Sequence, residues 1–176
     1  MRKETLILVV DDDESVRNII AQFLNYHNYK TVCASDTNTG FELFTAMQPD
    51  VVITDLIIPD NDGIQFMEKI RDNSSETPVI IVTGLGVYED AIRALKSGAW
   101  DFITKPIDFN ILLHSIEKVL ERSCLIIENR KYREELEKEV EIRTRQLMDK
   151  TRELEKTNML LIEELKRRNS CRELIN

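Results

Sequence analysis

Two sequence periods alternate along residues 1–120 and restrict the fold more than any other feature. Short apolar runs rich in β-branched residues are typical of strands that are buried on both faces. Helix-length stretches separate these runs and carry apolar residues three and four positions apart. Five such strand–helix units predict an α/β fold, in which a five-stranded parallel sheet is doubly wound, with helices on both faces. The apolar runs are Leu6–Val10, Thr31–Ala34, Val51–Thr54, Val79–Val82 and Asp101–Thr104.

Polar side chains follow four of these five runs. In a doubly wound sheet the carboxyl ends of the strands share one edge, and ligands bind beyond that edge. We therefore expect these side chains to lie close together. They are Asp11, Asp12 and Asp13 after the first run, Asp55 after the third, Thr83 after the fourth and Lys105 after the fifth.

The residue types at this edge suit phosphoryl chemistry. Clustered carboxylates repel one another unless a cation neutralises them, and carboxylate oxygens favour Mg²⁺. A carboxylate can also act as a nucleophile and accept a phosphoryl group as an aspartyl phosphate. A metal ion, an ammonium group and a hydroxyl group would then neutralise the phosphoryl oxygens. A single Asp or Thr is more often a helix cap or a turn residue, but side chains at four strand ends favour a functional site.

Four segments resemble the receiver domain of two-component response regulators. They are Leu-Val-Val-Asp-Asp-Asp-Glu at 8–14, Thr-Asp-Leu-Ile-Ile-Pro-Asp-Asn-Asp-Gly at 54–63, Val-Thr-Gly at 82–84 and Asp-Phe-Ile-Thr-Lys-Pro at 101–106. Pro59 follows Asp55 by four residues and Gly63 follows it by eight, as in the phosphoacceptor loop of that family. The resemblance covers about residues 5–120 and implies the flavodoxin-like receiver fold.

The resemblance implies a phosphoacceptor and a metal site. Asp55 would accept a phosphoryl group from a partner histidine kinase, with Mg²⁺ as the cofactor. Asp12 and Asp55 would bind Mg²⁺ directly, the backbone carbonyl of Ile57 would be a further ligand, and Asp11 would act through a water molecule.

The resemblance also implies a switch next to the phosphoacceptor. Thr83 would hydrogen-bond the phosphoryl group and Lys105 would pair with it. Phe102 would be the aromatic switch residue, packing inward when Thr83 moves. The bond between Lys105 and Pro106 would be cis, which an X-Pro bond tolerates.

Two apolar residues flank the expected approach of water to the phosphoryl group. Ile57 follows Asp55 by two residues and Leu85 follows Thr83 by two. We hypothesise that they exclude water and lengthen the lifetime of the phosphorylated state. The alternative interpretation is that both are ordinary exposed loop residues.

A second enzyme class shares part of the pattern. Asp11-Asp12-Asp13-Glu14-Ser15 fits the D-x-D-x-[ST] motif of haloacid-dehalogenase-like phosphatases, in which Asp11 would be the nucleophile and Asp13 the general acid. Those enzymes usually need a second acidic pair at a later strand, and none is evident. The receiver function is therefore favoured: a phosphoacceptor signalling domain, with any enzymatic output beyond this chain.

Charge and composition divide the chain in two. Residues 121–176 carry 14 basic and 13 acidic side chains and no Gly or Pro. Residues 1–120 carry 10 basic and 19 acidic side chains, with every Gly and Pro. This division predicts a receiver domain at 1–120 and a helical coiled-coil connector at 121–176.

The same composition excludes several classes of partner and location. The acidic balance argues against nucleic acid as a partner, because counterion release needs clustered Lys and Arg. Leu6–Val10 is too short to span a membrane, and Met1–Glu4 is no convincing signal segment. Cys33, Cys124 and Cys171 form no metal or disulfide pattern. We expect a cytoplasmic protein.

No helix-breaking residue follows Pro106, which predicts a fifth helix from about Asp108 to about Arg168. One heptad position, d, is mostly apolar, and position a is mostly polar, so the pattern predicts a weak coiled coil and, as first choice, a parallel homodimer. The alternative is a single solvated helix held by pairs four residues apart. The d residues are Val119, Ile126, Arg133, Val140, Leu147, Leu154 and Leu161; the a residues are Ser123, Arg130, Glu137, Thr144, Thr151, Asn158 and Leu165.

The segments at 128–136 and 141–147 also resemble connector helices that follow receivers in multidomain signalling proteins. The cognate kinase, the signal and the output are not named by the sequence. We expect the chain to be the front part of a longer protein, rather than one in which the helix itself is the output.

Overall fold

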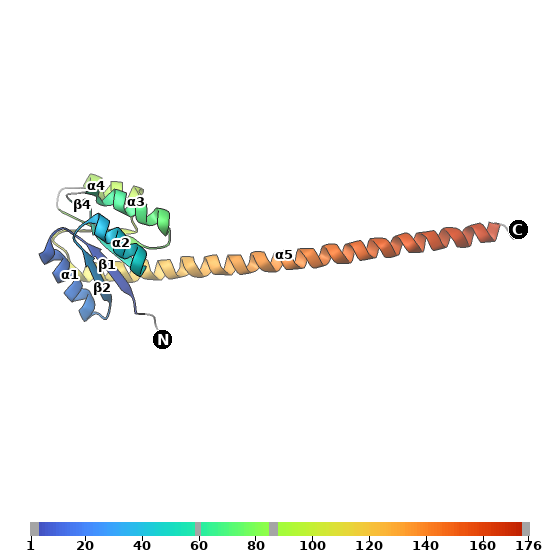
Figure 1. The fold of residues 1–176 in the computed structure, drawn as a ribbon, viewed down its shortest axis with the longest axis horizontal. Helices are drawn as coiled ribbons and strands as arrows, with labels where there is room; N and C mark the ends of the chain where they lie inside the picture. Colours follow the sequence, from blue (N-terminus) through green and yellow to red (C-terminus); the bar gives the residue numbers. More distant parts are fainter. Residues whose placement is uncertain (1–3, 59–60, 85–87, 174–176) are drawn as a thin grey trace. The chain divides into compact units, whose positions relative to one another are not determined.

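The computed structural model describes residues 4–58, 61–84 and 88–173. The chain divides into two compact units, Met1–Ile127 and Glu128–Asn176. The first unit contains a five-stranded parallel sheet with strand order β2-β1-β3-β6-β7 (Figure 1). The predicted doubly wound fold is confirmed. The strands are β1 (Leu6–Val10), β2 (Lys30–Ala34), β3 (Val51–Asp55), β6 (Val79–Thr83) and β7 (Asp101–Thr104).

Helices cover both faces of this sheet because alternate strand residues point to opposite sides. In β1, Leu8 and Val10 belong to one buried cluster, with residues of α2 (Thr37–Met47), α3 (Gly63–Asn73) and α4 (Tyr88–Lys96). Ile7 and Val9 belong to the other, with residues of α1 (Glu14–Tyr26) and α5 (Phe109–Glu173). Each large aliphatic side chain buried in this way contributes about 1.5–3 kcal/mol to folding.

Aspartates start four of the helices at the same edge of the sheet. The carboxylate of Asp13 accepts from the backbone N–H of Ser15 at 2.8 Å, and that of Asp62 accepts from Ile64 at 3.0 Å. Asp36 and Asp108 accept from backbone N–H groups at the starts of α2 and α5 in the same way. These caps satisfy N–H groups that have no partner within the helix, so each chain segment turns sharply after its strand.

One element was not predicted. β4 (Ile57–Ile58) and β5 (Asn61–Asp62) pair antiparallel, where the sequence indicated only a loop. The hairpin ends at Gly63, whose backbone N–H donates to the carbonyl of Leu56 at 2.9 Å. A Cβ atom on Gly63 would collide with the backbone carbonyl of Asp55, so this close return of the chain requires glycine.

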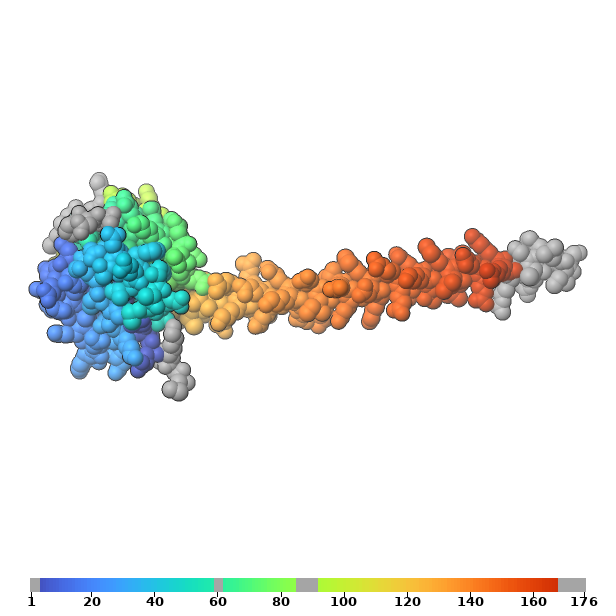
Figure 2. All heavy atoms as spheres, in the orientation of Figure 1, coloured from blue at the N-terminus to red at the C-terminus, as the bar shows by residue number. Residues whose placement is uncertain are grey.

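The second unit is the continuation of α5. This helix begins at Phe109 and ends at Glu173, which confirms the predicted long C-terminal helix. Every side chain from Glu128 to Arg167 is exposed (Figure 2). The coiled coil stays a prediction. The first compact unit extends past residue 120, where the sequence placed the domain boundary. No helix in the described part of the chain has an apolar stretch long enough to cross a membrane.

Candidate functional site

The carboxyl ends of β1, β3, β6 and β7 bring together the polar residues that the sequence singled out. β3 lies between β1 and β6, and β7 borders β6. Three of these side chains are almost fully buried: Asp11 is 2% exposed, Thr83 2% and Asp55 8%. Because an unpaired carboxylate is costly to bury, Asp11 and Asp55 need a cation close by.

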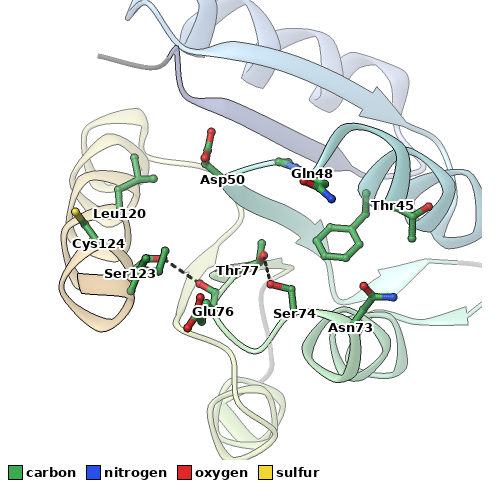
Figure 3. Close-up of a pocket in the computed structure, with 13 residues that line it drawn as sticks. Thr45, Gln48, Asp50, Asn73, Ser74, Glu76, Thr77, Leu120, Ser123 and Cys124 are labelled. Carbon is green, nitrogen blue, oxygen red and sulfur yellow. Dashed lines mark hydrogen bonds between the residues drawn. The ribbon is translucent and has the colours of Figure 1, made fainter. Parts of the chain in front are cut away.

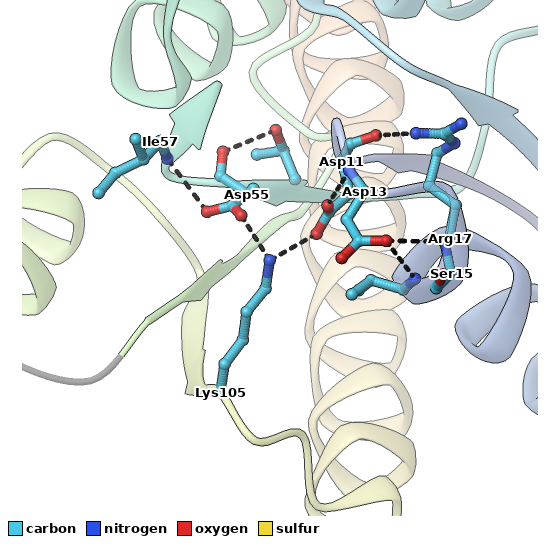
Figure 4. A network of polar contacts seen from close by, with 9 residues as sticks. Asp11, Asp13, Ser15, Arg17, Asp55, Ile57 and Lys105 are labelled. Atoms are coloured by element: carbon cyan, nitrogen blue, oxygen red, sulfur yellow. Dashed lines mark hydrogen bonds and ion pairs between the residues drawn. The ribbon is translucent and has the colours of Figure 1, made fainter. Parts of the chain in front are cut away.

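Lys105 supplies a positive charge to both carboxylates (Figure 4). Its Nζ atom lies 2.8 Å from Oδ2 of Asp11 and 2.5 Å from Oδ2 of Asp55. Burial by itself lowers the pKa of the Lys105 amino group, but the hydrogen bonds and charges of Asp11 and Asp55 outweigh it, and the pKa is raised overall. The bond between Lys105 and Pro106 is cis, as the resemblance implied.

Three carboxylates form an acidic cluster that could hold a metal ion. Oxygen atoms of Asp11, Asp12 and Asp55 all lie within 4.8 Å of one another. Asp12 is exposed, whereas Asp11 and Asp55 are buried, so the cluster opens toward solvent on one side. Such a set of hard oxygen donors, one of them facing solvent, suits a divalent cation that retains several water molecules.

The hydroxyl group of Thr83 can make a further hydrogen bond. Its buried Oγ1 atom has no hydrogen-bond partner within the described part of the chain. Buried hydroxyl groups are normally paired, and an orphan at a candidate site points to a ligand. Phe102, on the neighbouring strand β7, is partly buried and packs against the cluster that contains β1, α2 and α3 residues.

The other predicted residues take different positions. Asp13 is the N-cap of α1, and its carboxylate binds backbone N–H groups instead of joining the acidic cluster. The backbone N–H of Ile57 donates to Oδ1 of Asp55 at 3.0 Å, and the Ile57 side chain is 66% exposed. Leu85 lies outside the described residues.

Sequence reasoning missed Arg17. Its Nη1 atom donates to the backbone carbonyl of Asp11 at 2.6 Å, which ties α1 to the end of β1 (Figure 4). The only available signal was a basic residue one turn after the Asp13 cap, and that pattern is common on solvated helix faces. The contact places a second positive charge beside the acidic cluster.

A hollow of about 590 Å³ lies at the other edge of the sheet (Figure 3). Asp50 and Thr77 come just before β3 and β6, so this hollow borders the amino ends of the strands. Ser123 of α5 donates to the carbonyl of Glu76 at 2.9 Å, and Thr77 donates to Ser74 at 2.9 Å. Polar groups that line this hollow are thus hydrogen-bonded to one another. The acidic cluster therefore remains the candidate site.

A comparison with known protein families identifies the domain that contains the acidic cluster. The sequence model of the response regulator receiver domain family matches residues 7–117, which are more than half of the chain. The chain belongs to the response regulator receiver family. A receiver domain is a signalling phosphoacceptor of two-component systems, and its phosphodonor is a histidine kinase. The alternative assignment to haloacid-dehalogenase-like phosphatases is not supported.

Individual relatives share the receiver domain. The chain is 35% identical over 115 residues to the regulatory protein AtoC of Escherichia coli, covering 65% of this chain and 25% of that protein. It is 32% identical over 130 residues to the DNA-binding dual master transcriptional regulator RpaA of Synechocystis sp., covering 73% of this chain and 54% of that protein. The chain thus spans about half or less of the length of these curated relatives.

A crystal structure shows the same fold. The response regulator receiver domain protein from Clostridium thermocellum superposes with a TM-score of 0.67 at 31% identity. The match covers 69% of this chain and 98% of that one. The portion of the present chain that it leaves out is comparable in length to the exposed continuation of α5.

The contacts of Lys105 in the receiver domain predict a pH dependence. Lys105→Met leaves the carboxylates of Asp11 and Asp55 buried without their cation, so we expect a lower free energy of unfolding at pH 8. The pKa of Lys105 is raised above its ordinary value of 10.5. The stabilisation is therefore fully present below that value and is lost as the pH rises through the raised pKa.

Urea denaturation of the wild type and of Lys105→Met, without divalent cations, measures this difference. It should be constant between about pH 8 and 9 and shrink in the upper interval, where the pH rises above about 10.5 and the ammonium group with its raised pKa loses its proton. A difference that stays constant across the upper interval contradicts the assigned role of the ammonium group.

Proposed function

We propose that this receiver domain accepts a phosphoryl group on Asp55 from a histidine kinase, with Mg²⁺ as the cofactor. The observation that carries the proposal is the pairing of Lys105 with both Asp11 and Asp55 beside the exposed carboxylate of Asp12. Asp55 lies at the end of the central strand β3, between the strands that supply the other groups. This arrangement supports Asp55 as the residue that reacts.

The residues present fit a magnesium site. Asp12 and Asp55 would bind the ion directly, Asp11 would act through water, and the backbone carbonyl of Ile57 would complete the protein ligands. When bound, Mg²⁺ supplies positive charge to the phosphoryl oxygens. The acidic cluster offers oxygen ligands and retains one open side, as magnesium sites in phosphoryl transfer require.

The transfer itself needs little from the protein beyond position and charge. A carboxylate oxygen of Asp55 forms a bond to phosphorus while the phosphorus–nitrogen bond of the phosphohistidine breaks, and the imidazole leaves with the electron pair of that bond. Lys105 holds the carboxylate of Asp55 in place before the transfer and pairs with the phosphoryl oxygens afterwards. The backbone N–H of Ile57 steadies the other carboxylate oxygen.

We propose that Thr83 and Phe102 transmit the effect of phosphorylation from the site to the surface of the domain. The unpartnered Oγ1 of Thr83 would gain a phosphoryl oxygen as its acceptor. The resulting movement of Thr83 would open space for Phe102 to pack further inward. A domain that populates two such arrangements shifts toward the one that the phosphoryl group stabilises.

We propose that residues 121–176 act as a connector that pairs with a second copy of the chain as a parallel homodimer. The exposed apolar residues at heptad position d support this role. The domain would act in the cytoplasm as a signalling phosphoacceptor and not as an enzyme. One relative, RpaA, is named a DNA-binding transcriptional regulator, and the absence of nucleic-acid binding in the present chain stays a prediction.

The phosphoacceptor assignment predicts opposite outcomes at two aspartates. Asp55→Asn removes the nucleophile and should abolish labelling of the chain by radioactive acetyl phosphate in the presence of Mg²⁺. Asp13→Asn is the matched control, because asparagine caps a helix about as well as aspartate; it should be labelled like the wild type. Labelling of Asp55→Asn together with loss of labelling in Asp13→Asn would contradict the proposal.

Two neighbouring leucines test the homodimer. Leu161 occupies heptad position d and is 53% exposed, whereas Leu160 is 66% exposed and occupies position c, outside the predicted seam. Leu161→Glu places a charge in the seam of both copies and should raise the dimer dissociation constant by roughly 100-fold or more, whereas Leu160→Glu should leave it unchanged. Sedimentation equilibrium measures both constants. Equal effects of the two substitutions would contradict the seam.

A further inference from the structure

The exposed part of α5 carries one consistent seam from Val140 onward. Position d holds Val140, Leu147, Leu154 and Leu161, all more than half exposed. Position a holds Thr144, Thr151, Asn158 and Leu165. Along the chain, the steps between successive d and a residues are alternately four and three positions, which is the spacing of a two-stranded left-handed coiled coil. From Val140 to Leu165 the seam therefore needs no interruption.

When the same heptad assignment is continued toward the amino end of the second unit, it places charged residues at the core positions. The three preceding core positions are Glu137, Arg133 and Arg130. A parallel homodimer would bring each of these charged side chains against the same residue of the second copy, and like charges that meet in a poorly solvated seam repel each other. The residues directly before these three are Leu136, Tyr132 and Asn129. Leu136 is 42% exposed and Tyr132 is 61% exposed. The apolar stripe is thus displaced by one residue.

An ion pair on the helix agrees with the displaced stripe. Nε of Arg130 lies 3.7 Å from Oε1 of Glu134. In the displaced assignment Arg130 is at position b and Glu134 at position f, on the outer side of a coiled coil where solvent surrounds both charges. In the undisplaced assignment the same pair would be at positions a and e, within or beside the seam.

We propose that residues 128–165 pair with a second copy through a seam that shifts by one residue between Leu136 and Val140. This inference rests on the proposed parallel homodimer and defines its partner surface. The core residues around the shift, Tyr132, Leu136, Val140 and Thr144, are four positions apart. Each four-residue step advances about 40° around an α-helix, so the left-handed supercoil unwinds locally there.

Charge complementarity identifies the occupant as a second, parallel copy. In a parallel pair, position g of one helix faces position e of the next heptad in the other. Lys150 then faces Glu155 of the second copy. In the displaced heptads Glu128 faces Arg133 of the second copy, and this attraction exists only with the shift. Asn158 meets its own counterpart only when the two helices are parallel and in register.

The surface of the helix also offers a receptor for a side chain of the second copy. An open groove on the helix surface is lined by Thr144, Leu147, Met148, Thr151, Arg152 and Glu155. The first four residues stand at i, i+3, i+4 and i+7, the four corners of a hole that receives one knob of the facing helix. In a parallel pair in register, the knob is Leu147 of the second copy.

Disulfide crosslinking of the full chain tests the shift residue by residue. Cys33, Cys124 and Cys171 are first replaced by serine. Single cysteines are then introduced in two matched pairs: Tyr132→Cys against Arg133→Cys, and Leu136→Cys against Glu137→Cys. Leu147→Cys and Leu154→Cys are the positive references, and Asp149→Cys at outer position f is the negative reference. Labelling by acetyl phosphate is measured on the cysteine-free background.

We expect disulfide-linked dimers at the two positive references and a crosslinked fraction at Tyr132→Cys and Leu136→Cys roughly tenfold or more above that of their neighbours, because a disulfide needs closely opposed Cα atoms. Equal fractions within each pair, or larger ones at Arg133→Cys and Glu137→Cys, would overturn the shift. Failure of both positive references would overturn the homodimer itself. Neither failure alters labelling at Asp55, so the phosphoacceptor assignment is judged separately.

Discussion

The site depends on the ion pairs that the ammonium group of Lys105 makes with the carboxylates of Asp11 and Asp55. Asp11 and Asp55 end strands that lie side by side, and their carboxylates would repel each other in a poorly solvated place. Lys105 binds both of them from the end of β7. The pairing links the ends of three strands of the sheet. A divalent cation at the acidic cluster would share this task and would bring the added charge that phosphoryl transfer needs.

The fold explains why these groups meet. Strands with apolar side chains on both faces must be covered by helices, so polar groups gather where the strands end. Asp13, Asp36, Asp62 and Asp108 start helices at that edge and turn the chain away from it. The close return of the chain at Gly63 holds the β4–β5 segment against the backbone of Asp55. Core packing and site geometry therefore have the same origin.

Most of this could be predicted from the sequence, since periodicity determines the strands and the residues after them determine the acidic edge. The β4–β5 hairpin could not, because strands of two residues leave no periodic signal. Asp13 was open to a catalytic interpretation, and only its contacts show a helix cap. Arg17 was missed because a lone arginine on a helix carries no pattern. The exposed helix from Glu128 onward agrees with the predicted long C-terminal helix, but the pairing of this helix depends on a second chain.

The central claim is that Asp55 is the residue that carries the phosphoryl group. The most direct measurement treats the chain with acetyl phosphate and Mg²⁺, reduces the product with sodium borohydride, which converts an aspartyl phosphate to homoserine, and locates the conversion by peptide mass spectrometry. The account predicts homoserine at position 55 and aspartate at positions 11, 12 and 13. Homoserine at position 11 with unmodified Asp55 would contradict it.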